Sequence, residues 1–600
     1  MAGTATAVSS ETTQQPPAQG GALAWLRGQI RSSELWLVFI AVLVGAVAGA
    51  MAMAQGVIAH ALQVVLFGIE PEVRLSVAPP IAPVRLLAIP VGGLILGGLA
   101  FLWTRRRPQP PVDPVEANAL RGGRMSIQDS LYVAAQTMIS NGFGASVGLE
   151  AAYTQMGAAI ASRLGVWLNL RRADLRLLVG AGAGAAIAAA FGAPLTGAFY
   201  AFEVVIGAYT VAGVAPVAAA ALAGALVARA SGEGVYGMAP QAFGAIVTLS
   251  AYGLYVGLGL VAAGFGILVM RLAALMERAA ARTPLPKALR PAIGGVILIA
   301  LALYSPQTLS SGHGALRQDL AMGPALQVVL ILLALKGLAS IVSLGFGFRG
   351  GLFFASLFLG SLLGRAYAMG LGFLHVPALT LNPTVAALVG MSALAVAVIG
   401  GPFTMTFLVL ETTGDFGITT AALTASLFAS LVVRETFGYS FSTWRLHLRG
   451  ETIRSAHDVG FLRTLTAGTM MRPVRGSIAA GASLAEARRR FPLGAVTRAV
   501  ITDEAGVYAG LLPIAKLYAE AAEPAKAPST VGALAEFKDA ALTPQMTIRE
   551  MMEAFDRTTA DELAVVDPEG QPLGMVSEAF ATRRYADELE KARRDLIGET

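Results

Sequence analysis

The sequence predicts an all-α domain that crosses a membrane many times, followed by a small α/β domain outside the membrane. Of the 600 residues, 55% are hydrophobic and only 14% are charged, and the mean hydropathy is +0.64. A water-soluble domain usually carries about 25% charged residues. Most of this chain therefore has no surface that faces water. The 68 glycines fit this interpretation, because small residues let membrane helices approach one another closely.

Composition also excludes several kinds of site. The chain has no cysteine, so it forms neither disulfides nor thiolate metal sites, and its five histidines leave little for a histidine-based metal centre. The net charge of +6 is distributed over loops and a tail, without basic patches interleaved with aromatic residues. We therefore expect no metal, no cofactor and no nucleic-acid partner.

Apolar stretches long enough to enter or span a bilayer recur from residue 35 to residue 438. Broken stretches at membrane depth are tolerated only inside protein or beside a cavity, which favours a transporter or channel over a simple anchor. We expect a disordered tail at 1–22 and a membrane domain at 23–450. The uninterrupted stretches cover 35–56, 86–103, 177–202, 211–227, 252–270, 293–304, 326–344 and 417–433, and the interrupted ones cover 131–164, 351–374 and 385–410.

Beyond residue 450 the charge content becomes that of a soluble domain. After a linker at 451–465, two related segments are expected at 466–525 and 526–600. The pattern Val500-Ile-Thr-Asp503, with glycines at 506 and 510, is echoed by Val565-Val-Asp567, with glycines at 570 and 574. Each copy predicts a strand, a tight turn and a second strand, preceded by a helix at 484–490 or 548–556.

The membrane domain contains a duplication of its own. Gly148-Leu149 and Gly351-Leu352 are each followed by a glycine nine positions after the first. Further along, a Gly-x-Pro or Gly-Gly-Pro motif leads to Glu203 in one copy and Glu411 in the other, again with nine positions from proline to glutamate. Duplicated halves are typical of transporters, whose substrate site lies where the halves meet. Two helix N-termini converging there would present unpaired N–H groups to an anion.

These segments resemble the CLC family of chloride channels and anion/proton exchangers. Gly148-Leu149-Glu150-Ala151-Ala152 stands where that family has G-x-E-G-P, and Gly351-Leu352-Phe353-Phe354-Ala355 stands where it has G-x-F-x-P. The resemblance covers residues 35–449. It implies transport of a small monovalent anion, either chloride or nitrate, by a homodimer with one pore in each subunit. It also implies inverted halves of broken, tilted helices, cytoplasmic termini and a multi-pass location in a bacterial inner membrane.

Glu150 is the candidate gate. In the resembling family this glutamate places its carboxylate where the anion binds and swings away when protonated. Acidic side chains within a membrane are costly and usually mark ion or proton paths. The alternative is that Glu150 merely interacts favourably with the dipole of the helix that it begins.

Other anion-binding positions are also implied by the resemblance. An ungapped alignment puts Pro111 at the family's ion-binding serine, where proline offers neither a hydroxyl nor an N–H. In the family a proline here is associated with nitrate preference, although 104–114 can also be an ordinary proline-rich loop. The family's anion-binding tyrosine corresponds to either Tyr439 or Ser442, and the alignment does not choose between them. The remaining implied positions are Gly148, Leu149, Gly351, Leu352, Phe353 and Phe354.

The proton path of exchangers is interrupted in this sequence. The family's inner proton glutamate directly follows the glutamate that ends the first Pro-Leu helix, and here that pair is Glu203-Val204. Valine cannot carry a proton, so we expect channel-like or weakly proton-coupled transport. A chloride/proton antiporter with an altered internal path is the alternative. Glu203 and Glu411 are expected to be structural acids at helix ends.

The C-terminal segments resemble a pair of CBS domains. Such pairs often bind adenine nucleotides through a Ser or Thr and an Asp three residues later. Here Ser577 is followed by Phe580, and Pro513 by Lys516, so we expect dimer packing rather than nucleotide binding.

Two other classes of protein remain to be weighed. A membrane-bound hydrolase would need a metal motif, a Ser/His pair or an Asp dyad within its spans, and none is found, so we expect no enzyme activity. A cation transporter with a regulatory tail would need several acidic residues facing a cavity, and Glu150, Glu203 and Glu411 are the main ones available.

Overall fold

The structure is a computed structural model, which describes residues 34–232, 247–448, 465–474, 476–519 and 530–597. The chain divides into two compact units, Met1–His457 and Asp458–Thr600. The predicted tail at 1–22, and the predicted linker up to residue 464, lie outside the described residues.

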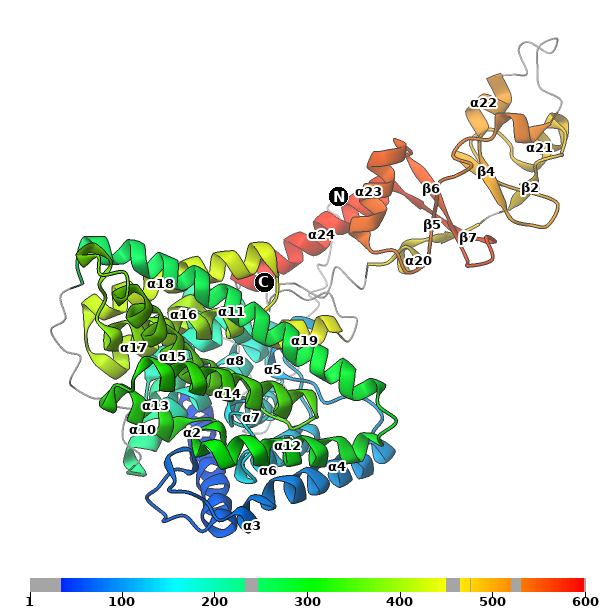
Figure 1. Ribbon diagram of the computed structural model, residues 1–600. Helices are drawn as coiled ribbons and strands as arrows, with labels where there is room; N and C mark the ends of the chain where they lie inside the picture. The colour runs from blue at the N-terminus through cyan, green and yellow to red at the C-terminus, as the bar shows by residue number, and fades with distance from the viewer. Residues whose placement is uncertain (1–33, 233–246, 449–464, 475, 520–529, 598–600) are drawn as a thin grey trace, which may run out of the picture. The chain divides into compact units, whose positions relative to one another are not determined.

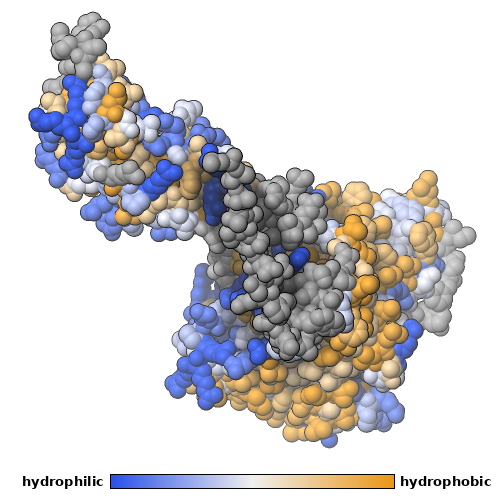
Figure 2. Space-filling model, turned by 180° about the vertical axis from the view of Figure 1, so that it is seen from behind, coloured by the Kyte–Doolittle hydropathy of each residue, from blue (hydrophilic) through white to orange (hydrophobic). Residues whose placement is uncertain are grey.

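The described residues of the first unit form helices joined by loops, without a strand (Figure 1). Among its described residues, nine helices are long and apolar enough to cross a membrane. Large apolar side chains are exposed on its surface, where Figure 2 shows a broad hydrophobic area. The first half contains α2 (Glu34–Phe67), α3 (Pro83–Leu86), α4 (Ala88–Arg106), α5 (Pro114–Leu120), α6 (Ile127–Gly142), α7 (Glu150–Trp167), α8 (Arg172–Phe191), α9 (Pro194–Tyr200), a π-helical turn (Ala201–Ile206) and α10 (Val211–Ala230).

The second half repeats much of this order. It contains α11 (Leu249–Arg282), α12 (Arg290–Tyr304), α13 (His313–Met322), α14 (Leu326–Gly345), α15 (Phe353–Gly372), α16 (Pro383–Ile399), α17 (Pro402–Thr413), α18 (Phe416–Thr436) and α19 (Phe441–Leu448).

The two halves use the same helix contact. A Cβ atom added at Gly157 of α7 would collide with the carbonyl oxygen of Gly182 in α8, and the reverse substitution would collide as well. Gly360 of α15 and Gly390 of α16 form the equivalent pair in the second half. Gly157 and Gly360 are the glycines that the sequence repeat places nine positions after its start. Glycine therefore recurs at these two positions because the backbones of two helices are in contact at each of them.

Two apolar cores of the membrane unit each belong mainly to one half, whereas a third core joins residues of both halves. One core is formed mainly by α2, α7, α8 and α10, and the other by α11, α15, α16 and α18. Tyr200 and Ile399 pack against both cores. These two residues therefore lie on the seam between the halves.

The C-terminal unit contains two small mixed sheets. The three-stranded sheet has the order β2 (Ser477–Ala479), β3 (Arg498–Thr502), β4 (Tyr508–Pro513), and the four-stranded sheet has the order β1 (Arg472–Pro473), β7 (Pro572–Ser577), β6 (Glu562–Val566), β5 (Ala541–Leu542). In each sheet one pair is parallel and the next is antiparallel with an irregularity near its end. The accompanying helices are α20 (Ala467–Met470), α21 (Leu484–Arg490), α22 (Ile514–Ala519), α23 (Ile548–Thr558) and α24 (Glu578–Ile597).

The two copies in this unit are interlaced. Strand β1 comes from the range 466–525 but pairs with β7 of the second copy. Conversely, Val531 and Leu534 come from the range 526–600 but belong to the apolar core of the first sheet. The expected boundary at 525/526 therefore separates the two sequence copies, but each sheet is packed with residues from both sides of it.

Candidate functional site

The two glycine-started segments of the membrane unit meet in an antiparallel bridge. The N–H of Gly148 donates to the carbonyl oxygen of Gly351 at 2.9 Å, and the N–H of Gly351 donates to that of Gly148 at 3.2 Å. Helices α7 and α15 begin just beyond this bridge. The N-termini predicted to face one another are thus joined by two backbone hydrogen bonds.

The carboxyl group of Glu150 folds back onto this bridge. A Cβ atom added at Gly148 would collide with its Oε2 atom, and one added at Gly351 would lie 3.3 Å from it. A side chain at position 148 would therefore displace the Glu150 carboxyl group from this place. The side chain is only 5% exposed, and Oε2 has no hydrogen-bond partner among the described residues. The backbone amides of Glu150 and Phe354 are its favourable neighbours.

A cavity of about 550 Å³, here called the central cavity, opens beside Glu150. It is bounded by the loop before α5, the middle of α6, the first turns of α7, the end of α9, the C-terminal part of α11, the loop before α15, the end of α16 and the start of α19. Six of the predicted site residues line it: Pro111, Glu150, Gly351, Leu352, Phe353 and Ser442.

The other predicted residues lie around it. Leu149 lines a separate cavity of about 350 Å³, called here the outer cavity, together with His60, Arg74 and His313. Adjacent residues, Leu149 and Glu150, thus face different cavities. Glu150 therefore lies at the barrier between them.

A third, smaller cavity of about 160 Å³ continues from the central one. Val115, Ile399 and Ser442 line both. Tyr439 and the Glu203-Val204 pair line only the smaller cavity. Of the two residues that the alignment left open, only Ser442 reaches the central cavity.

The two remaining predicted anion-binding residues, Gly148 and Phe354, do not line any of these three cavities but lie behind their walls. Gly148 forms the backbone bridge described above. Phe354 is buried, with its ring stacked on Phe191 and on His313, at centroid distances of 6.1 and 3.6 Å.

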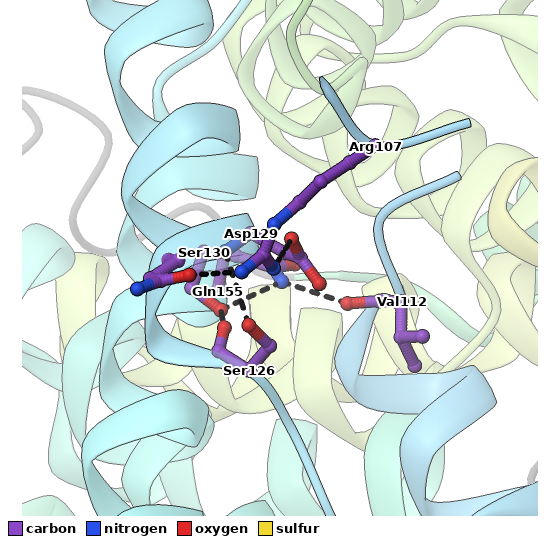
Figure 3. Close-up of polar contacts among 7 residues, drawn as sticks. Arg107, Val112, Ser126, Asp129, Ser130 and Gln155 are labelled. Carbon is purple, nitrogen blue, oxygen red and sulfur yellow. Dashed lines mark hydrogen bonds and ion pairs between the residues drawn. The ribbon is translucent and has the colours of Figure 1, made fainter. Parts of the chain in front are cut away.

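A polar cluster holds the proline-rich loop against the site (Figure 3). Gln155, one turn and a half beyond Glu150 in α7, donates to the backbone carbonyl of Val112 at 2.8 Å and to Ser130 Oγ at 3.1 Å. Nearby, Arg107 pairs with Asp129 at 2.8 Å. Because the loop carries Pro111 into the wall of the central cavity, these contacts fix the position of that wall.

Glu203 and Glu411 bind the N-termini of helices in the opposite half. The Glu203 carboxylate accepts from the N–H groups of Phe403 and Thr404 at 3.1 and 2.8 Å, and from Thr404 Oγ1 at 2.7 Å. The Glu411 carboxylate accepts from the N–H groups of Leu195 and Thr196, both at 2.8 Å, and from Thr196 Oγ1 at 2.7 Å. Glu203 thus caps α17, the helix that carries Glu411. Glu411 in turn caps α9, the helix that leads to Glu203.

Three functional candidates were not identified from the sequence motifs. Tyr200 and Arg349 line the central cavity. Lys336 of α14 is 1% exposed, and its Nζ atom donates to the backbone carbonyls of Thr308, Leu309 and Ser310 at 3.3, 3.5 and 2.7 Å. The position of Lys336 within an apolar stretch could have marked it as a candidate from the sequence. Its hydrogen-bond partners could not be predicted, because they lie on a loop that is distant in the sequence. In the part of the chain that the structure describes, no group of three or more His, Cys, Asp or Glu residues is placed to hold a metal ion.

Comparison with known proteins agrees with this geometry. The family profile described as "Voltage gated chloride channel" matches residues 112–434, more than half of the chain. A ClcB-like chloride channel protein of Ralstonia nicotianae is 31% identical over 344 residues, covering 55% of this chain and 78% of that protein. The voltage-gated ClC-type chloride channel ClcB of Citrobacter koseri is 28% identical over 364 residues, covering 60% of this chain and 86% of that protein.

Solved structures share the fold at lower identity. A slow cyanobacterial Cl⁻/H⁺ antiporter has a TM-score of 0.60 at 21% identity, covering 69% of this chain and 97% of that one. A eukaryotic CLC transporter has a TM-score of 0.58 at 19% identity, covering 92% of this chain and 98% of that one. The paired helix N-termini, the family match and these relatives show that the chain belongs to the family of voltage-gated chloride channels, the CLC family.

Proposed function

We propose that this protein carries small monovalent anions, chloride first among them, through a path that the carboxylate of Glu150 closes. The observation that carries the proposal is the position of that carboxylate. It is buried beside the Gly148–Gly351 bridge, at the meeting point of two helix N-termini. Backbone N–H groups at such a point favour negative charge without a buried lysine or arginine in the path.

We propose that the gate works because the Glu150 carboxylate and the transported anion compete for the same backbone N–H groups. An ionised Glu150 carboxylate fills the position near the Phe354 amide. When the carboxyl group is protonated, it loses its charge and its preference for that position, and a chloride ion can replace it. The Glu150 Oε2 atom is buried without a hydrogen bond, which costs free energy. The closed position of the side chain is therefore only moderately stable, and the side chain can leave it.

The family membership already makes this a multi-pass membrane protein of a channel and transporter family, and not an enzyme. We propose further that it resides in a bacterial plasma membrane with both termini in the cytoplasm. We also propose a homodimer with one path in each subunit, as the family resemblance implies. The C-terminal unit is proposed to be a CBS pair that packs between subunits without binding nucleotide.

Transport is proposed to be channel-like or only weakly coupled to protons. Val204 stands beside Glu203 on the wall of the small cavity, where an ionisable side chain would be needed to pass protons inward. Antiport of chloride and protons is the second candidate, because two proteins with similar folds are a Cl⁻/H⁺ antiporter and a fluoride/proton antiporter. Proton movement driven by a chloride gradient in sealed vesicles separates the two: channel-like transport predicts none.

Nitrate is proposed as an additional substrate. Pro111 lines the central cavity without a hydroxyl or an N–H, so that wall lacks a donor directed at a compact ion. Uptake of nitrate faster than that of chloride would agree with a nitrate preference, and comparable uptake of the two anions would contradict it.

The principal experiment uses anion efflux from liposomes that contain the full-length protein. Wild-type efflux should rise as the pH falls, whereas Glu150→Gln should be open and nearly independent of pH. Glu277→Gln is the matched control, because Glu277 is an exposed acid on the same cavity and should retain the pH dependence. Reversal potentials under anion and cation gradients give the charge of the ion. A cation-dependent potential, or a pH dependence that survives in Glu150→Gln, would refute the proposal.

A further inference from the structure

Tyr200 occupies an unusual position in the membrane unit. It is the last residue of α9, immediately before the π-helical turn Ala201–Ile206. Turns of this kind are rare and often occur at functional sites, because the extra residue changes which side chains face the same way. Tyr200 also packs against the cores of both halves. Its side chain is therefore held on the seam where the proposed path runs.

The ring and the hydroxyl of Tyr200 have different surroundings. The ring packs against that of Phe353, with the centroids 6.1 Å apart. The residue also lines the central cavity, with the Thr154 side chain as its hydrogen-bonding neighbour and the Glu150 carboxyl close enough to act on its charge. The ring is thus fixed by packing against Phe353, and the hydroxyl lies beside Thr154 and near the Glu150 carboxyl group, two residues that line the same cavity.

Besides the guanidinium groups of Arg278 and Arg349, few side chains of the central cavity carry a hydroxyl that could donate to an anion. Thr154 Oγ1 already donates to the backbone carbonyl of Glu150 at 2.9 Å. Pro111 contributes no donor. Among the lining residues that the structure describes, Tyr200 and Ser442 are the remaining hydroxyl-bearing side chains. The phenol hydrogen rotates about the C–O bond, so it can be donated either to Thr154 or into the cavity.

We propose that the Tyr200 hydroxyl is a direct ligand of the transported anion and sets the preference of the site among anions. The bound ion would receive the phenol hydrogen from the first half of the chain and the Ser442 hydroxyl from α19. Backbone N–H groups at the start of α15 would complete its shell. This inference rests on the proposed anion transport and adds a specificity residue to it.

A hydrogen bond to an anion is strongest when the negative charge is concentrated. Chloride and bromide hold their charge on one atom, whereas thiocyanate spreads it over three. Removal of one donor should therefore weaken the binding of the halides more than that of thiocyanate. A purely structural role for Tyr200 would change all three alike.

The test is the Tyr200→Phe variant of the full-length protein, which keeps the ring and removes only the hydroxyl. Chloride binding to the purified protein, measured by isothermal titration calorimetry, should weaken by about tenfold, as expected for one hydrogen bond to a charged group. Thiocyanate binding should change much less, so the ratio of the two affinities should shift. Bromide should be affected as chloride is.

Tyr255→Phe is the matched control, since Tyr255 is another buried tyrosine of the membrane unit that does not line the central cavity. It should leave the affinities and their ratio unchanged. Unaltered halide binding in Tyr200→Phe, or equal weakening for all anions, overturns the inference while leaving anion transport intact. Wild-type protein that neither binds nor conducts anions would instead refute the proposed function itself.

Discussion

Glu411→Gln replaces a carboxylate that accepts three hydrogen bonds by an amide that can accept at only one of its two terminal atoms. In the structure Oε1 accepts from the N–H of Leu195, while Oε2 accepts from the N–H and the hydroxyl of Thr196. Whichever way the amide turns, its NH₂ group faces at least one N–H donor. The N-terminus of α9 also loses the negative charge that its dipole favours.

The size of the effect follows from these contacts. One hydrogen bond to a charged group contributes about 1.5–3 kcal/mol, and the dipole interaction adds about 0.3–1 kcal/mol. The threonine hydroxyl can rotate away from the new NH₂ group, so it adds little to the loss. We therefore expect Glu411→Gln to lower the free energy of unfolding by about 2–3 kcal/mol.

The internal symmetry supplies the control. Glu203→Gln disturbs an equivalent set of three contacts, to Phe403 and Thr404, and should cost a similar amount. Only Glu203 lines one of the three cavities, so only its variant should also alter anion efflux. Unfolding in detergent, followed by denaturant titration, measures the first quantity, and liposome efflux measures the second. A Glu411→Gln effect below about 0.5 kcal/mol, the range of an ordinary surface substitution, would refute the reasoning.

Three further predictions concern other parts of the chain. Gln155→Leu removes the hydrogen bonds to Val112 and Ser130. Amide hydrogen exchange in the loop 110–114 should become faster, and the affinity for anions should fall. Unchanged exchange in this loop would contradict the role of Gln155 in holding it. Lys336→Met leaves three buried carbonyl groups without their donor and should destabilise the membrane unit by about 3 kcal/mol in the same unfolding assay, with Lys336→Arg milder. Burial raises the pKa of Glu562 in β6, with the charge of Asp561 adding to the effect. Its ionised form therefore destabilises the folded unit as the pH rises above the unfolded pKa of about 4.3. Glu562→Gln should slow amide exchange in β6 at pH 8 relative to wild type, with little difference at pH 4, and an equal effect at both would contradict the cause.

Local patterns in the sequence were sufficient for most of the membrane fold, because hydropathy directly reflects burial in a bilayer. The first apolar stretch is an instructive exception: α2 continues past the expected end at residue 56 to Phe67. Gln55 is buried within the helix and donates to the carbonyl of Met51, so a polar side chain does not interrupt it. Hydropathy alone cannot distinguish a glutamine buried within a helix from a helix end.

The repeat spacing predicted which helix N-termini meet, and the Gly148–Gly351 bridge agrees with it. The contribution of Tyr200 to the central cavity could not be predicted in this way, because the repeat has no equivalent aromatic residue that would mark it. The pairing of β1 with β7 was likewise hidden, since it joins strands about a hundred residues apart through backbone groups that no side-chain pattern marks.

The bridge between Gly148 and Gly351 also constrains how the protein is made. Its two glycines are separated by 203 positions in the chain, so the ribosome completes the whole first half before the second partner exists. During that interval the newly inserted helices can assemble among themselves, but the anion pocket has only one of its walls. Contacts of such long sequence separation form slowly. Conduction should therefore arise at a late stage of biogenesis, and a nascent chain released after α10 would be inserted yet unable to leak ions.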